Sequence, residues 1–301
     1  MKYQLEFDDT ISPTGGSNLV YGYQRLETPS TASVRQINSE YSPNEAKRTK
    51  CTASPVILGG SFQIDRVIAQ TSGAINEMDF QIKEKTKAGA NYFHNLVING
   101  TSASSGTGYV PNTFDGLKKI LTGKSTEMTT DIDISTSALL DSNYNALLDE
   151  LDTFIALLAA KPDVLMMNSK MLTKVKSAAR RAGYYDRNKD DFGRTVETYN
   201  GIILMDAGQY YNGSTTEDVV STSTPGSNAY GTTDIYAAKL GLDAFHGISV
   251  DGSKMLKTYL PDLQAPGAVK TGEVELIAGA VLKNSKMAGV LKGIKLLGKT
   301  A

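Results

Sequence analysis

The residues best suited to acid–base chemistry occur as closely spaced carboxylate pairs. These pairs are Asp131 with Asp133, Asp190 with Asp191, and Glu273 with Glu275. A general acid and a general base must converge on one substrate bond, and residues one or two positions apart do not do so by themselves. We therefore interpret these carboxylates as parts of solvated turns or strand faces, and a carboxylate-type hydrolase remains an alternative.

Residue types that bind metals or phosphates are sparse. The chain has two histidines, His94 and His246, and one cysteine, Cys51, which cannot complete a usual structural zinc set. The glycine-rich segments 59–60 and 106–108 lack the lysine and the spacing of a phosphate-binding loop, and we interpret them as turns. A single cysteine also excludes an intramolecular disulfide framework. We expect no catalytic residue, no cofactor and no metal site.

Charge and length exclude several classes of protein. The 301 residues suffice for a sizeable core, and 31 basic residues balance 32 acidic ones, so no global field draws the chain to nucleic acid or to an anionic membrane. The N-terminal residues have no apolar segment of signal-peptide type, and no run of about 18 apolar residues occurs. We expect a protein without a membrane partner that is soluble and acts inside a cell.

The most regular segment is TSGAINEMDFQIKEKTKAGANYFHNLVING, which predicts a helix over about residues 71–98. Thr71 or Ser72 is suited to cap its start, and Asn99-Gly100 supplies a stop that tolerates a left-handed backbone. A helix of about 26 residues is roughly 39 Å long, so we expect a rigid beam. Its predicted buried stripe consists of Ile75, Met78, Ile82, Phe93 and Leu96.

The region before this helix is predicted to be extended. Residues 1–19 read as an arm, and residues 20–66 hold the strand-like pieces VYGYQRLE, ASVRQINSEY and PVILGGSFQIDRVI. The dense charges of the second region either keep a flexible hairpin soluble or meet a neighbouring subunit, because a two-stranded ribbon is barely stable alone. The charged residues predicted to make inter-subunit contacts are Arg25, Glu27, Arg35, Glu40, Lys47, Arg48 and Lys50.

The rest of the chain alternates helices and strands. SALLDSNYNALLDELDTFIALLAA predicts a core helix that ends at Lys161-Pro162, DVLMMN a buried strand, and SKMLTKVKSAARRAG a helix capped by Asn168 or Ser169. A hairpin is expected around Asn200-Gly201, and residues 208–233 read as a long surface loop. The C-terminal strands are expected to pair with residues before 138.

The helix after DVLMMN carries the densest basic patch in the chain. It either forms a solvated face near the negative end of a helix, or makes loose contact with an acidic neighbour or with DNA, through phosphates and without reading bases. Its basic residues are Lys170, Lys174, Lys176, Arg180 and Arg181.

The order of these segments resembles the major capsid proteins of tailed bacteriophages, which have the Hong Kong 97 fold. The most specific motifs are Phe114-Asp115-Gly116-Leu117 after the long helix and Tyr199-Asn200-Gly201 before the late strand. The resemblance implies an α+β fold with an N-terminal arm (1–19), an extended two-stranded loop (20–66), a peripheral domain (67–138 and 266–301) with a spine helix, and an axial domain (139–265) with loop 208–233 near its tip.

The same resemblance implies a structural protein and not an enzyme. The expected function is an icosahedral virion capsid built from hexamers and pentamers around double-stranded DNA and assembled in the host cytoplasm. Expected partners are other copies of the chain, portal and scaffolding proteins and a decoration protein. An encapsulin-type nanocompartment shell is the nearest alternative, and a tail-tube or adhesion protein leaves the long helix unexplained.

Overall fold

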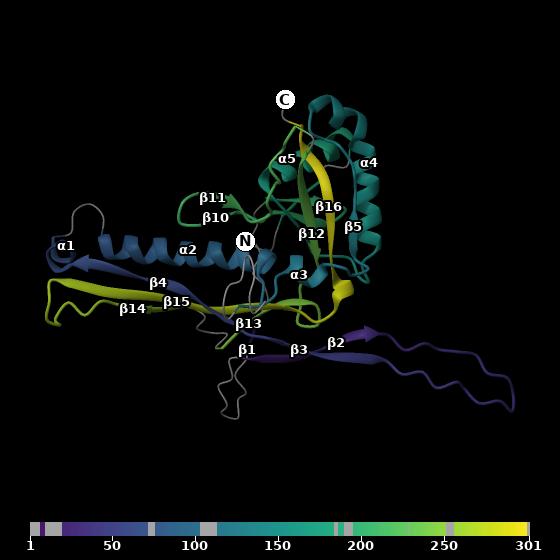
Figure 1. Ribbon diagram of the computed structural model, residues 1–301, viewed down its shortest axis with the longest axis horizontal. Helices are drawn as coiled ribbons and strands as arrows, with labels where there is room; N and C mark the ends of the chain where they lie inside the picture. The colour runs from purple at the N-terminus through teal and green to yellow at the C-terminus, as the bar shows by residue number, and fades with distance from the viewer. Residues whose placement is uncertain are drawn as a thin grey trace.

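The computed structural model describes residues 7–9, 20–71, 76–102, 113–183, 186–189, 195–227, 229–250 and 256–299. Its described residues form an elongated part around one long helix, an upright part around a large sheet, and a narrow ribbon that projects from both (Figure 1). Helices and sheets pack together in both parts, so the predicted α+β class is confirmed. No helix in these ranges combines the length and apolar character needed to cross a membrane.

The elongated part pairs helix α2 with a sheet whose two long strands run side by side. Helix α2 spans Glu77–Asn99. The sheet strands are β1 (Phe7–Asp9), β4 (Val56–Asp65), β13 (Phe245–Ser249), β14 (Leu256–Tyr259) and β15 (Val269–Leu282). Their order is β1–β13–β15–β14, and β4 pairs with β15 along its whole length. This pairing confirms that the C-terminal segment returns to residues before 138.

Two glycines lie within β4, so the turn predicted at residues 59–60 is wrong. A Cβ atom on Gly59 would stand 1.9 Å from the carbonyl oxygen of Val274 on β15. Glycine at this position therefore allows the two backbones to approach closely.

Helix α2 is shorter than predicted. Asn76 caps it by accepting a hydrogen bond from the amide of Met78 at 3.1 Å, and residues 66–70 form the separate helix α1 (Arg66–Gln70). The helix ends at Asn99 as expected, but Gly100 has φ −54° and is not left-handed. Of the predicted stripe, Phe93 and Leu96 are buried, Met78 and Ile82 are half-buried, and Ile75 lies outside the described residues. The buried stripe thus occupies only the last turns.

The upright part contains a seven-stranded sheet within the described residues, in the order β5–β16–β12–β6–β9–β8–β7. Its strands are β5 (Glu127–Thr129), β6 (Val164–Met167), β7 (Asp186–Lys189), β8 (Thr195–Tyr199), β9 (Ile202–Asp206), β12 (Gly231–Ala238) and β16 (Ala288–Leu297). Helices α4 (Ser137–Ala156) and α5 (Ser169–Arg181) cover it on one side. The short helices α3 (Leu117–Leu121) and η1 (Ser285–Met287) connect it to the elongated part.

Strand β6 is buried along its entire length because both faces of the sheet are covered. Leu165 and Met167 pack in the core beneath α4 and α5. Val164 and Met166 pack in the second core, which also contains the end of α2. This arrangement explains the unbroken apolar run DVLMMN and confirms the predicted helix–strand–helix unit, although α4 ends at Ala156, before Lys161-Pro162.

Asn168 is a buried helix cap with further partners. Its Oδ1 accepts from the amide of Met171 at 2.8 Å, and its Nδ2 lies 3.0 Å from the carbonyl oxygen of Val220 and 2.9 Å from Oγ1 of Thr233. The side chain therefore joins the start of α5 to β12 and to the segment before it.

We expect Asn168→Ala to lower the free energy of unfolding by about 2 to 3 kcal/mol, because it leaves buried donors and acceptors without partners. Asn76→Ala, which removes the exposed cap of α2, is the matched control and is expected to cost about 1 kcal/mol. Urea denaturation of both variants tests the difference, and equal losses would contradict the role assigned to the buried contacts.

Two hairpins follow α5. The β8–β9 turn is the predicted one, with positive φ at Asn200 (51°) and Gly201 (71°), as a tight two-residue hairpin requires. Residues 208–233, predicted as an irregular loop, contain a second hairpin of β10 (Gln209–Tyr211) and β11 (Thr216–Asp218). The ring of Tyr210 lies 6.2 Å from that of Tyr92 on α2, so this hairpin packs on the long helix.

The projecting ribbon consists of β2 (Tyr21–Thr28) and β3 (Lys47–Ala53), which pair antiparallel. The segment 32–41, predicted as a strand, contains no strand, and the predicted strand 55–68 belongs to the long sheet as β4. The two-stranded element therefore contains fewer residues than the predicted range 20–66. Its far end extends well away from the body of the protein (Figure 1).

Candidate inter-subunit surfaces

The outer end of the ribbon, residues 29–46 and here called the tip, exposes large apolar side chains. Val34 is 100% exposed, Ile37 92% and Tyr41 59%. Single exposed apolar residues are common, but three on one narrow projection with no core beneath them are typical of a surface that another chain covers. Contact through these residues was not predicted, because their alternation with polar residues was interpreted as a strand.

Most of the charged residues predicted for inter-subunit contact are exposed on the ribbon. Arg35, Glu40, Lys47, Arg48 and Lys50 are exposed, whereas the side chain of Glu27 lies outside the described part of the structure. Arg35 lies at the tip, where its guanidinium stands 5.6 Å from the ring centre of Tyr41. These five side chains are accessible to a neighbour, and contact with one remains a prediction.

Arg25 contacts its own chain. Its Nε and Nη2 donate to the carbonyl oxygen of Leu282 at 3.3 and 3.2 Å, and Nη2 also donates to the Tyr23 hydroxyl at 3.0 Å. Leu282 ends β15, so Arg25 ties the base of the ribbon to the long sheet. This intramolecular contact was not predicted, because the sequence does not reveal which carbonyl oxygen lies within reach.

We expect Arg25→Ala to loosen the ribbon without unfolding the protein, since hydrogen bonds to a charged group contribute about 1.5 to 3 kcal/mol. Amide hydrogen exchange in β2 and β3 should rise by about tenfold. Arg48→Ala is the control, because Arg48 donates to Gln24 on the same ribbon, at 3.4 Å, and not to the long sheet in the described part of the chain. Unchanged exchange in Arg25→Ala would show that other contacts fix the ribbon.

The motif Phe114-Asp115-Gly116-Leu117 packs against the end of the long helix. Phe114 and Leu117 are 1% and 0% exposed. The amide of Gly116 donates to the carbonyl oxygen of Gly100 at 2.9 Å, and a Cβ atom on Gly116 would lie 2.6 Å from both Gly100 N and Ile98 O. The motif therefore requires glycine where two backbone segments touch.

Asp115 fixes the chain on either side of this contact. Its Oδ1 accepts from the amide of Ser102 at 2.8 Å and from the Ser102 hydroxyl at 2.6 Å, and it lies 2.8 Å from Nζ of Lys119. Burial opposes the negative charge, but the hydrogen bonds from Lys119 and Ser102 outweigh it and hold the pKa of Asp115 below its ordinary value. The carboxylate thus stays ionised and links the end of α2 to α3.

The family of the chain follows from a comparison with protein-family models. The model described as SU10 major capsid protein matches residues 48–203, which is more than half of the 301 residues. The chain belongs to the SU10 major capsid protein family. No curated protein matches it.

Solved structures show that this capsid protein has the Hong Kong 97-like fold. The capsid of the empty GTA particle is similar at TM-score 0.60 and 13% identity, over 96% of this chain and 88% of that one. The capsid of Myoviridae phage XM1 is similar at TM-score 0.53 and 12% identity, over 96% and 90%. The SrpI encapsulin of Synechococcus elongatus is similar at TM-score 0.66 and 11% identity, over 99% and 88%. At such low identities these likenesses concern the fold.

The basic helix of this capsid protein, α5, is partly neutralised by its own chain. Lys176 forms an ion pair with Glu197, and Arg181 forms one with Asp141 at 2.6 Å. Lys170 and Arg180 are exposed and Lys174 is half-buried. The two ion pairs weaken the case for α5 as a DNA-facing surface, which remains a prediction.

Asp131 and Asp133, which were considered for catalysis, bond to different side chains. Asp131 forms an ion pair with Lys295 at 2.6 Å, whereas Asp133 accepts from the hydroxyl of Ser135 at 2.7 Å. Glu273 and Glu275 lie along β15, and residues 190 and 191 are outside the described ranges.

The two histidines lie in different elements. Burial lowers the pKa of His94 on α2 to about 4, and His246 is buried in β13. Within the described chain, no three potential ligands gather as a metal site.

Proposed function

We propose that this major capsid protein assembles into hexamers and pentamers that close an icosahedral shell around the double-stranded DNA of a tailed phage. The observation that carries the proposal is the ribbon, whose tip exposes Val34, Ile37 and Tyr41 far from the protein's own core. Burial of apolar surface drives most protein association. A contact from a projecting arm to the body of the next copy is heterologous, and such contacts form a ring where the rotation between copies closes.

In this proposal the fold divides into four functional parts. Residues 1–19 are the proposed arm, of which the structure describes only Phe7–Asp9. The β2–β3 ribbon reaches over an adjacent subunit, α2 with the long sheet forms a peripheral domain, and the upright sheet with α4 and α5 forms an axial domain. The proposed ribbon ends at Ala53, because β4 pairs with β15. Arg35, Glu40, Lys47, Arg48 and Lys50 are its proposed ionic contacts, and Lys170, Lys174 and Arg180 are the proposed contacts of α5 with DNA.

The proposed role is structural and includes no catalytic step. Assembly is placed in the host cytoplasm, and portal, scaffolding and decoration proteins are the proposed further partners. A hydrolase remains the competing class, and hydrolytic activity that disappeared in Asp131→Asn or Asp133→Asn would favour it.

Negative-stain electron microscopy of the purified protein, with and without a candidate scaffolding protein, tests the proposal. Round shells or five- and six-fold rings are the expected result. A homogeneous monomer under both conditions would contradict it. Shells purified from infected cells with a protein cargo and no genome would favour an encapsulin-type compartment, the alternative suggested by the likeness to the SrpI encapsulin.

A further inference from the structure

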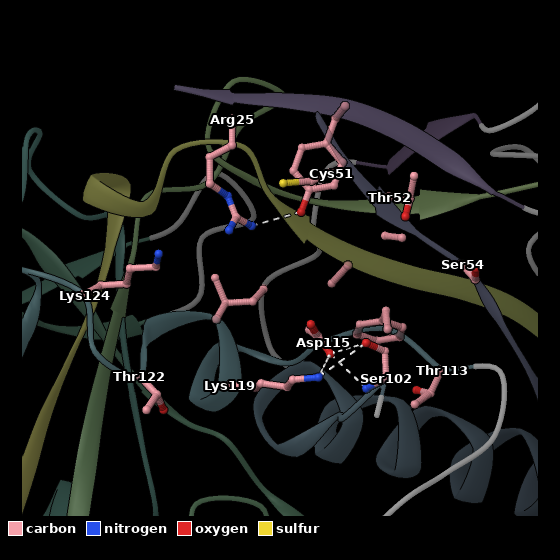
Figure 2. A pocket seen from close by; sticks show the side chains of 15 residues that line it. Arg25, Cys51, Thr52, Ser54, Ser102, Thr113, Asp115, Lys119, Thr122 and Lys124 are labelled. Carbon is pink, nitrogen blue, oxygen red and sulfur yellow. Dashed lines mark hydrogen bonds and ion pairs between the residues drawn. The ribbon is translucent and has the colours of Figure 1, made fainter. Parts of the chain in front are cut away.

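A polar pocket lies between the base of the ribbon and α3. Its volume is about 570 Å³, and its walls come from β2, β3, the motif around Asp115, α3 with the loop after it, and β15. Figure 2 shows Arg25 entering this space from the ribbon, while Lys119 and Lys124 approach it from the opposite wall. The pocket is thus a recess where the ribbon leaves the body of the protein.

The charge of the pocket is positive. Three cationic side chains and one carboxylate line it: Arg25, Lys119, Lys124 and Asp115. Asp115 is paired with Lys119 at 2.8 Å, whereas Arg25 has the neutral oxygens of Leu282 and Tyr23 as partners. Within the described part of the chain, neither Arg25 nor Lys124 forms an ion pair. The half-buried guanidinium therefore lacks a counter-charge, and burial makes such a charge costly.

Hydrogen-bonding groups surround these cations. The side chains of Thr52, Ser54 and Thr122 line the pocket. Thr113 also lines it, and its Oγ1 is buried without a hydrogen-bond partner in the described chain. Cations that form no ion pair and have hydroxyl groups around them are suited to bind a carboxylate through charge-assisted hydrogen bonds.

We propose that this pocket receives a carboxylate from the ribbon tip, Glu40 or Glu45, of a second copy of the chain. The inference rests on the self-assembly proposed above. Both glutamates are exposed on the tip, which begins after Thr28, the last residue of β2, about 10 Å beyond Arg25 at about 3.3 Å per residue. The tip extends away from the body of its own chain (Figure 1). It therefore reaches such a pocket only on another copy.

The geometry of this contact suits closed assemblies. A tip that binds the base of the next ribbon makes a head-to-tail contact, which repeats around a ring until the ring closes. DNA phosphate is a poorer occupant, because nucleic acid is bound along basic grooves that follow the backbone, whereas this recess is local and contains Asp115. The recess therefore suits one carboxylate side chain of another copy better than a nucleic-acid strand.

Lys124→Glu tests the inference, because Lys124 is exposed and its replacement leaves the core intact. We expect the protein concentration needed for assembly to rise by at least tenfold. Lys118→Glu is the matched control, since Lys118 is exposed on α3 but does not line the pocket. Adding Glu40→Lys or Glu45→Lys to Lys124→Glu should restore assembly. Thermal unfolding followed by circular dichroism, unchanged from wild type, verifies that the variants fold.

The outcomes separate the two proposals. A wild-type protein that does not assemble overturns the proposed function itself. A wild-type protein that assembles while Lys124→Glu assembles equally well overturns only the pocket contact. Normal assembly of Lys124→Glu with loss of retained DNA would assign the pocket to phosphate instead.

Zero-length carbodiimide cross-linking of assembled shells identifies the occupant directly. Mass spectrometry is expected to find Lys124 joined to Glu40 or Glu45 of another copy, which isotope-labelled mixtures of subunits distinguish from a link within one chain. A link from Lys124 to any other carboxylate, or no link at all, overturns the proposal.

Discussion

Replacing Gly116 by alanine is expected to lower the free energy of unfolding by about 3 kcal/mol or more, because a Cβ atom has no space there. It would stand 2.6 Å from Gly100 N, 2.6 Å from Ile98 O and 2.7 Å from Ile98 C. All three are backbone atoms, which cannot rotate away as a side chain does. The clash is relieved only if the motif moves away from the end of α2, and this movement exposes Phe114 and Leu117.

Gly89→Ala is the matched control for Gly116→Ala. Gly89 lies within α2, and a Cβ atom there would meet nothing within 4 Å. Alanine is the better helix former by about 0.8 to 1 kcal/mol, so this variant should be more stable than the wild type. Urea denaturation of the unassembled protein measures both. A Gly116→Ala variant as stable as the wild type would mean that the motif tolerates separation from the helix.

The parts of the fold predicted from sequence are those set by local physics. The strand DVLMMN, the cap at Asn168 and the turn at Asn200-Gly201 each depend on residues close in the chain, and all three are confirmed. Periodicity also predicted that α2 would be long. It did not predict the start of α2, because Asn76 and Thr71 are both suitable caps and only the surrounding structure selects one.

The errors arise where distant segments decide the conformation. Gly59 and Gly60 have the composition of a turn, yet pairing with β15 keeps them in a strand. Segment 208–233 has the polar composition of a loop, but Tyr210 reaches Tyr92 and orders a hairpin on α2. Neither contact is encoded in the local sequence.

The candidate site was predicted only in outline for the same reason. Charge density singled out the ribbon, and Arg35, Glu40, Lys47, Arg48 and Lys50 are exposed there, but their contact with a neighbouring subunit stays a prediction. The anchor at Arg25 depends on the carbonyl oxygen of Leu282, which is 257 positions away. The pocket likewise joins Arg25 of β2 to Lys119 and Lys124, which are about a hundred positions away in α3 and the loop after it, so no spacing rule could reveal it.

Replacing Val34, Ile37 and Tyr41 together by serine is expected to abolish shell formation while the subunit still folds. These side chains are 100%, 92% and 59% exposed, so the isolated subunit gains little stability from them. Complete burial of one such side chain contributes about 1.5 to 3 kcal/mol. Losing three at each contact therefore weakens association by at least about 4 kcal/mol, or about a thousandfold.

The loss of association free energy is multiplied over the ring, because every subunit makes the same contact. Ser33→Ala with Gln36→Ala is the matched control, since both side chains lie on the same tip and are exposed but polar. Sedimentation velocity should show shells for the wild type and the control, and only small species for the triple variant. The thermal unfolding temperatures of the unassembled proteins should agree. Shells of normal size and yield from the triple variant would mean that contacts other than these three apolar side chains hold the subunits together.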